Sequence, residues 1–95
     1  MEFEVNDDED TLTVLSYSPD DLRWDNIIIY CYNDTATSII EKTGYISVGD
    51  VIDVTESDLE GNVIVEIWFD NDTTLIPLGS YEFYISSSSS GTQYY

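Results

Sequence analysis

Val63-Ile64-Val65-Glu66-Ile67-Trp68-Phe69 is the stretch of this chain that decides its fold. Its β-branched and aromatic side chains favour extended backbone. A turn bounds it on each side, with Asp58-Leu59-Glu60-Gly61-Asn62 before it and Asp70-Asn71-Asp72 after it. A short apolar run between two polar turns predicts a β-strand with antiparallel neighbours.

The same alternation of short apolar runs and polar turns extends along the chain. The expected strands cover residues 3–5, 11–17, 26–32 with Trp24 just ahead, 51–55, 63–69, 73–76 and 81–85. We expect a loop or a short irregular piece over 33–43, and Pro77 and Gly79 to separate the last two strands. About seven short strands, with no sustained helical period, predict an all-β fold: a small antiparallel β-sandwich of the immunoglobulin-like kind.

The chain of 95 residues is long enough for one domain. We expect residues 1–85 to form the sandwich and 86–95 to be a flexible tail, because serine and glycine tracts bury too little to become ordered. The strand pattern predicts a core, although alternation alone permits either parity where both faces are apolar. The expected core residues are Leu12, Val14, Trp24, Ile27, Ile29, Val51, Val54, Ile64, Ile67, Trp68 and Phe83.

The charge of the chain excludes several classes of function. Twenty acidic residues oppose two basic ones, Arg23 and Lys42, which gives a net charge of −18, and histidine is absent. Such a chain has no basic patch for nucleic acid and is repelled by anionic membranes. Without histidine it lacks the usual general base and zinc ligand. Carboxylate pairs must arise by chance among so many acids, and we expect no enzymatic activity.

One acidic turn has the composition of a calcium loop. Asp70-Asn71-Asp72-Thr73-Thr74 resembles the start of such a loop, because calcium prefers carboxylate and carbonyl oxygens. The glycine and glutamate that an EF-hand needs further along are missing. Asp70 and Asp72 are therefore the candidate calcium ligands, and no other cofactor is expected.

The single cysteine and two glycosylation motifs bear on the compartment. Cys31 stands alone, so it forms no internal disulfide, and its apolar surroundings predict a small buried side chain. Asn33-Asp34-Thr35 and Asn71-Asp72-Thr73 both match the acceptor motif for N-glycosylation in expected loops. These sequons slightly favour an extracellular location.

The order of motifs along the chain supports a family resemblance. The motifs are Phe3 before an acidic turn, Thr11-Leu12-Thr13-Val14-Leu15, Pro19-Asp20-Asp21-Leu22-Arg23-Trp24-Asp25-Asn26-Ile27-Ile28-Ile29, Val48-Gly49-Asp50-Val51-Ile52-Asp53-Val54, Val63-Ile64-Val65-Glu66-Ile67-Trp68 and a closing segment over 75–83. In this order, over residues 3–85, the chain resembles the soluble β-domain of archaeal type IV pilin-like surface proteins.

The resemblance implies a non-catalytic structural and adhesive head domain, extracellular or at the cell surface. Its implied partners are other proteins, or copies of itself in a surface filament, and not nucleic acid. Pilin-like proteins attach to the membrane through a long apolar N-terminal helix. That helix is not part of this sequence, so membrane attachment is expected only through such a missing segment.

A second interpretation starts from the charge instead. A small, very acidic protein can imitate DNA and occupy the nucleic-acid channel of an enzyme, with electrostatic steering of the encounter. Strand alternation places Glu2, Glu4, Asp53 and Glu66 on solvent faces. An acidic DNA-mimic inhibitor is therefore the alternative function.

Overall fold

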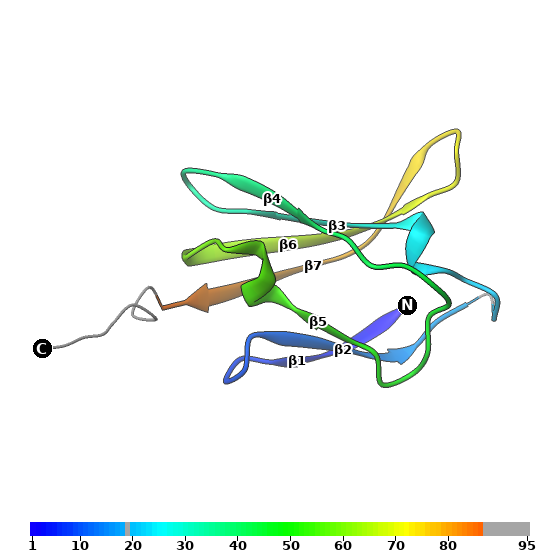
Figure 1. Cartoon of the computed structure of the whole chain (residues 1–95), viewed down its shortest axis with the longest axis horizontal. Coiled ribbons are helices and arrows are strands. Elements are labelled where there is room, and N and C mark those ends of the chain that lie inside the picture. The colour runs from blue at the N-terminus through cyan, green and yellow to red at the C-terminus, as the bar shows by residue number, and fades with distance from the viewer. Residues whose placement is uncertain (19, 87–95) are drawn as a thin grey trace, which may run out of the picture.

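Seven strands in two antiparallel sheets make up the computed structural model, which describes residues 1–18 and 20–86. One sheet has the order β1-β2-β5, with β1 at Glu2–Asn6, β2 at Thr11–Ser16 and β5 at Val51–Asp53. The other has the order β4-β3-β6-β7, with β4 at Thr37–Ile40, β3 at Ile27–Tyr32, β6 at Gly61–Asp70 and β7 at Leu75–Ile85. Figure 1 shows the two sheets as separate layers.

The predicted all-β antiparallel sandwich is confirmed, because one hydrophobic core joins residues of both sheets. In a constant-type immunoglobulin domain, the first, second, fifth and fourth strands form one sheet, and the third, sixth and seventh form the other. Here the fourth strand pairs with the third, while the other six strands keep those sheet assignments. The immunoglobulin-like part of the expectation stays a prediction.

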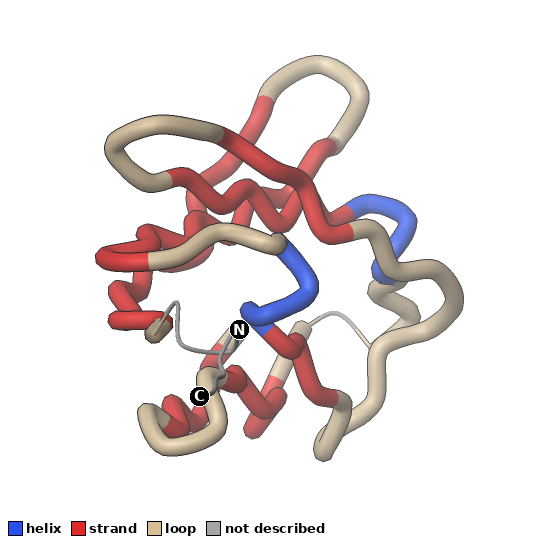
Figure 2. Tube along the Cα trace, turned by 60° about the vertical axis from the view of Figure 1, so that its left-hand side comes forward, coloured by secondary structure: helices blue, strands red, loops and turns tan. Residues whose placement is uncertain are grey.

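Two 3-10 turns carry the chain from one sheet to the other. Turn η1 (Trp24–Asn26) lies between β2 and β3, and turn η2 (Val54–Ser57) lies between β5 and β6. Figure 2 shows both as blue segments. The Asp53 side chain caps η2 by accepting a hydrogen bond from the Thr55 amide at 3.0 Å. Trp24, expected to lead directly into the third strand, lies in η1 and is buried there.

Eight of the expected core residues are buried: Leu12, Val14, Trp24, Ile27, Ile29, Val54, Ile67 and Phe83. Three expectations were wrong. Val51 is 44% exposed, and Ile64 and Trp68 are half-buried on the outer side of β6. Ile52, Val63 and Val65 point into the core instead, since neighbouring strand residues face opposite sides.

The segment 33–43, expected as a loop or short irregular piece, contains strand β4. It pairs with β3 in the register that sets Ile39 opposite Tyr30 and Ile40 opposite Ile29. Ile40 enters the core, while Ile39 is 56% exposed. The polar composition of the segment hides the strand, because only Ile40 of its four residues is buried in the core.

The last two expected strands are one strand, β7, which continues through Pro77 and Gly79. Proline is tolerated there because β7 lies at the edge of its sheet and one side needs no hydrogen bonds. A register shift between Ile67 and Trp68 of β6 accommodates the irregularity.

The predicted serine-rich tail, 86–95, lies outside the described residues except for Ser86, so the domain boundary stays a prediction. Within the part of the chain that the structure describes, no helix has the length and apolar character needed to cross a membrane.

Candidate functional site

The outer side of the four-stranded sheet is the surface with the most unusual chemistry. Strand β3 turns alternate residues inward to the core, and the same holds for the middle of β6. The residues left on the outer side are half-buried although they face away from the core, which indicates that they cover one another. This outer aromatic face consists of Ile28, Tyr30, Tyr32, Ile64, Glu66 and Trp68.

Glu66 lies at the centre of this face and is held in place. Its cross-strand neighbour is Tyr30. The Tyr32 hydroxyl donates to Glu66 Oε2 at 2.9 Å, and the Trp68 indole N–H donates to Oε1 at 3.2 Å. The rings of Tyr30 and Tyr32 lie 5.4 Å apart between centroids. The hydrogen bond that the Tyr32 hydroxyl donates to Glu66 raises the pKa of the Tyr32 phenol. Both carboxylate oxygens are thus fixed by neutral donors.

A hollow of about 420 Å³ adjoins Glu66 on the β7 side. It is lined by Glu66, Trp68, Pro77, Leu78, Gly79 and Ser80. The register shift in β6 pairs Trp68 with Pro77, so small residues of β7 lie beside the carboxylate. The hollow gives a ligand side chain room to approach Glu66.

Few other acids lie in this sheet. Of the twenty acidic residues, its four strands contain three: Glu66, Asp70 and Glu82. The others lie in the opposite sheet, in turns and in the 3-10 segments. The outer aromatic face is therefore a weakly charged surface within a strongly acidic protein.

The predicted calcium ligands, Asp70 and Asp72, flank the turn between β6 and β7. The Asp72 amide donates to Asp70 Oδ1 at 2.9 Å, and Asn71 Oδ1 accepts amides from Thr73 and Thr74. These oxygens stabilise the turn. Among the described residues, no group of three or more acidic, cysteine or histidine side chains is arranged to hold a metal. Calcium binding stays a prediction for Asp70 and Asp72, with no third carboxylate beside them.

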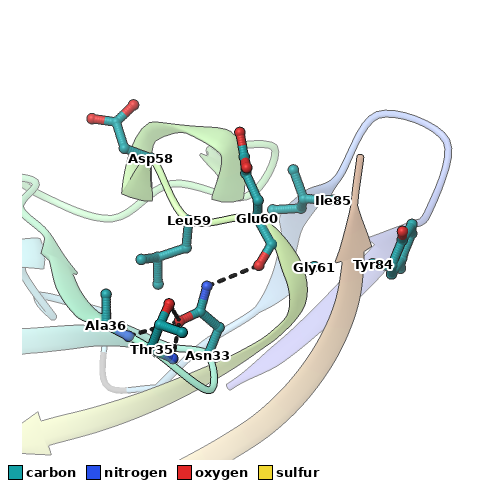
Figure 3. Close-up of a pocket in the computed structure, with 9 residues that line it drawn as sticks. All are labelled: Asn33, Thr35, Ala36, Asp58, Leu59, Glu60, Gly61, Tyr84 and Ile85. Carbon is teal, nitrogen blue, oxygen red and sulfur yellow. Dashed lines mark hydrogen bonds between the residues drawn. The ribbon is translucent and has the colours of Figure 1, made fainter. Parts of the chain in front are cut away.

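A second hollow, of about 440 Å³, lies where the β3–β4 turn meets the start of β6 (Figure 3). Asn33 occupies its floor. Its Oδ1 accepts the amides of Thr35 at 2.9 Å and Ala36 at 2.8 Å, and its Nδ2 donates to the Glu60 carbonyl at 2.8 Å. The first sequon therefore has a structural role, because Asn33 ties two turns together.

Cys31 is confirmed as a buried side chain, with no exposed surface. Burial raises the pKa of its thiol to about 11. The thiol is protonated at neutral pH, and the thiolate is the form that acts as a nucleophile.

A comparison with protein-family models, curated proteins and solved structures found no match to this chain. The pilin-like resemblance therefore stays a prediction that rests on its motifs.

Sequence reasoning missed the outer aromatic face as a unit. Its trace in the sequence is two short stretches in which polar or aromatic residues alternate with a buried one, Tyr30-Cys31-Tyr32 and Glu66-Ile67-Trp68. The two stretches lie far apart in the chain. Only the β3–β6 register, with Tyr30 opposite Glu66, brings them together.

Proposed function

We propose that this chain is a non-catalytic head domain of a surface protein, with a structural and adhesive role of the pilin-like kind. The observation that supports it is the outer aromatic face, on which Tyr30, Tyr32 and Trp68 lie over a closed core with no further described layer above them. Aromatic side chains with a polar end are enriched where proteins dock to one another. Such a face suits a domain whose work is contact.

Two edge strands carry features that discourage another chain from adding a strand, which favours contact through a sheet face. Strand β1, at one edge, carries the exposed acids Glu2 and Glu4, and edge strand β7 contains Pro77 and a register shift opposite it. Charged residues, proline and bulges at edges discourage another chain from adding a strand. Strand addition at these two edges is thus discouraged, while the outer side of the four-stranded sheet stays open to a partner.

The first experiment tests surface display. Antibodies against the folded domain are applied to intact cells of the source organism and to permeabilised cells. Equal labelling of the two samples is the expected result. Labelling that requires permeabilisation contradicts the proposal, and the acidic DNA mimic then becomes the function to test, by capture on cationic nucleic-acid enzymes.

The adhesive role is tested with a matched pair of variants. Trp68→Ser removes the indole from the outer aromatic face, whereas Tyr84→Ser removes a ring that is 71% exposed on β7. Both variants should fold. Loss of cell attachment with Trp68→Ser alone supports the proposal, and unchanged attachment with both contradicts a role for this face.

A further inference from the structure

We propose that Glu66 and the rings around it bind an arginine or lysine side chain from an extended segment of another protein. The inference deepens the proposed function and rests on it, since it gives the chemistry of the partner that the outer aromatic face contacts.

The carboxylate is organised before any ligand arrives. Its two oxygens are held by Tyr32 and Trp68 at 2.9 and 3.2 Å, so binding needs no rearrangement of Glu66. Each carboxylate oxygen has more than one lone pair, so each can accept a further hydrogen bond from a guanidinium or ammonium group. The hollow between Trp68 and Gly79 gives access from the β7 side.

The surroundings favour a cation over a neutral group. Aromatic faces attract ammonium and guanidinium groups through the ring quadrupole. Tyr30 lies opposite Glu66 on β3 with the Tyr32 ring beside it, and Trp68 lies two residues further along β6. A basic side chain in this position meets a fixed negative charge and aromatic rings together.

The chain does not supply this cation itself. Arg23 pairs with Asp25 at 2.9 Å and stacks over Tyr45, and the ammonium of Lys42 donates to the Val51 carbonyl at 3.1 Å. These two are the only basic side chains of the sequence, and both are engaged away from Glu66. A second copy would also bring another 18 negative charges. Charge complementarity therefore selects a different, basic partner, whose encounter the acidic turns accelerate.

The two tryptophans allow a direct test by NMR. Each indole N–H gives its own NMR signal. The indole N–H of Trp68 donates to Glu66, and the indole N–H of Trp24 donates to Asp50 beside the core. The probe is a short capped peptide of alternating threonine and arginine, and the control replaces each arginine with neutral citrulline. We expect the arginine peptide to shift the Trp68 signal in a saturable way, and the Trp24 signal to stay in place.

Two charge-matched variants locate the interaction. Glu66→Gln removes the central charge and keeps the shape, whereas Glu82→Gln removes one charge from the same side of the sheet, opposite Ile64, which lies two residues before Glu66 on β6. Loss of a charge-assisted contact should weaken binding about tenfold in Glu66→Gln. Glu82→Gln should bind nearly as well as the unmodified protein, and an unchanged Trp24 signal confirms that each variant is folded.

Three results overturn the inference: an unmoved Trp68 signal, equal weakening by both variants, or equal binding of the citrulline peptide. The second would mean diffuse attraction to an acidic surface, and the third would mean apolar contact alone. The cell-labelling experiment is independent of this titration. Labelled cells with no peptide binding would remove the cation site and leave the head-domain proposal standing, whereas the reverse pair of results would remove the head-domain role.

Discussion

Trp24 is buried in the core and also donates a hydrogen bond to the Asp50 carboxylate, so replacing it tests its packing and this hydrogen bond. The side chain is 2% exposed. Its indole N–H donates to Asp50 Oδ2 at 3.0 Å, and the same oxygen accepts the Ser47 amide at 2.9 Å. The Lys42 ammonium lies 5.5 Å from the ring centroid. Trp24 thus connects η1 to the turn before β5.

The expected cost follows from burial and from this hydrogen bond. Truncating a buried Trp to Ala costs about 3–5 kcal/mol. Trp24→Phe keeps a ring but loses a hydrogen bond to a carboxylate, which is worth about 1.5–3 kcal/mol. A domain of this size is stable by on the order of 5–10 kcal/mol. Since the free energy of unfolding falls by about 1–2 kcal/mol per molar urea, Trp24→Ala should lower the unfolding midpoint by roughly 1.5–5 M.

The assay is urea unfolding followed by far-UV circular dichroism, because losing an indole alters the fluorescence itself. Asp50→Asn completes a double-mutant cycle with Trp24→Phe. If the hydrogen bond joins the two residues, the double variant should lose less stability than the two single variants together, by about 0.5–3 kcal/mol. Additive effects, or an unchanged midpoint for Trp24→Ala, would refute the reasoning.

The same bond has a pH signature. The hydrogen bonds from Trp24 and then from Ser47 hold the pKa of Asp50 below its ordinary value of 3.8. A carboxyl whose pKa is lower in the folded state contributes stability that is complete above its unfolded pKa and lost as pH falls through its folded pKa. The stability gap between Asp50→Asn and the unmodified protein should therefore be constant near neutral pH and narrow below about pH 4. A gap that stays constant in acid would contradict the assigned hydrogen bonds.

Four further predictions follow from burial, charge and turn geometry. Ile67→Ala should cost about 2–5 kcal/mol in urea unfolding, whereas Ile39→Ala, at an exposed position, should change stability by about 0.5 kcal/mol or less; equal costs would contradict the observed strand faces. Added salt should raise the melting temperature, because it screens repulsion within a chain of charge −18, and a flat response in calorimetry would count against that repulsion. Cys31 should react with a thiol reagent in urea but not in the native protein, since it is buried with a raised pKa; rapid native labelling would show otherwise. In a glycosylating secretory host, mass spectrometry should find glycan on exposed Asn71 and not on Asn33, whose Nδ2 donates a hydrogen bond to the Glu60 carbonyl. Glycan on Asn33 would mean that this turn opens.

The sequence was sufficient for the class of fold because the strands alternate and the turns are clearly marked. It was insufficient for β4, where Thr37–Ile40 reads as a polar segment until its pairing with β3 is known. It also separated one strand into two at Pro77. A proline interrupts a central strand but not an edge strand, and edge position is a property of the assembled sheet.

The candidate site was predictable only in its parts. Glu66 was expected on a solvent face, but nothing local in the sequence shows that Tyr32 reaches it across 34 positions of the chain. The hydrogen bonds depend on the register of β3 against β6, and the neighbouring hollow depends on a register shift that exists only once β6 and β7 have paired. Tertiary pairing therefore creates the site from residues that are unremarkable one at a time.

The charge of Glu66 nevertheless decides which residues of β6 face the core. Placing Glu66 toward solvent requires Ile64 and Trp68 to face the same way, since side chains alternate with a period of two. The expectations that Glu66 is outward and that Ile64 and Trp68 are in the core therefore contradicted each other. Burying an unpaired carboxylate costs far more than exposing part of an isoleucine or a tryptophan, so the charge decides the parity. The same constraint that sends Val63, Val65 and Ile67 into the core puts Glu66 and Trp68 side by side on the outer face, which is why the fold and the proposed cation site depend on one alternation.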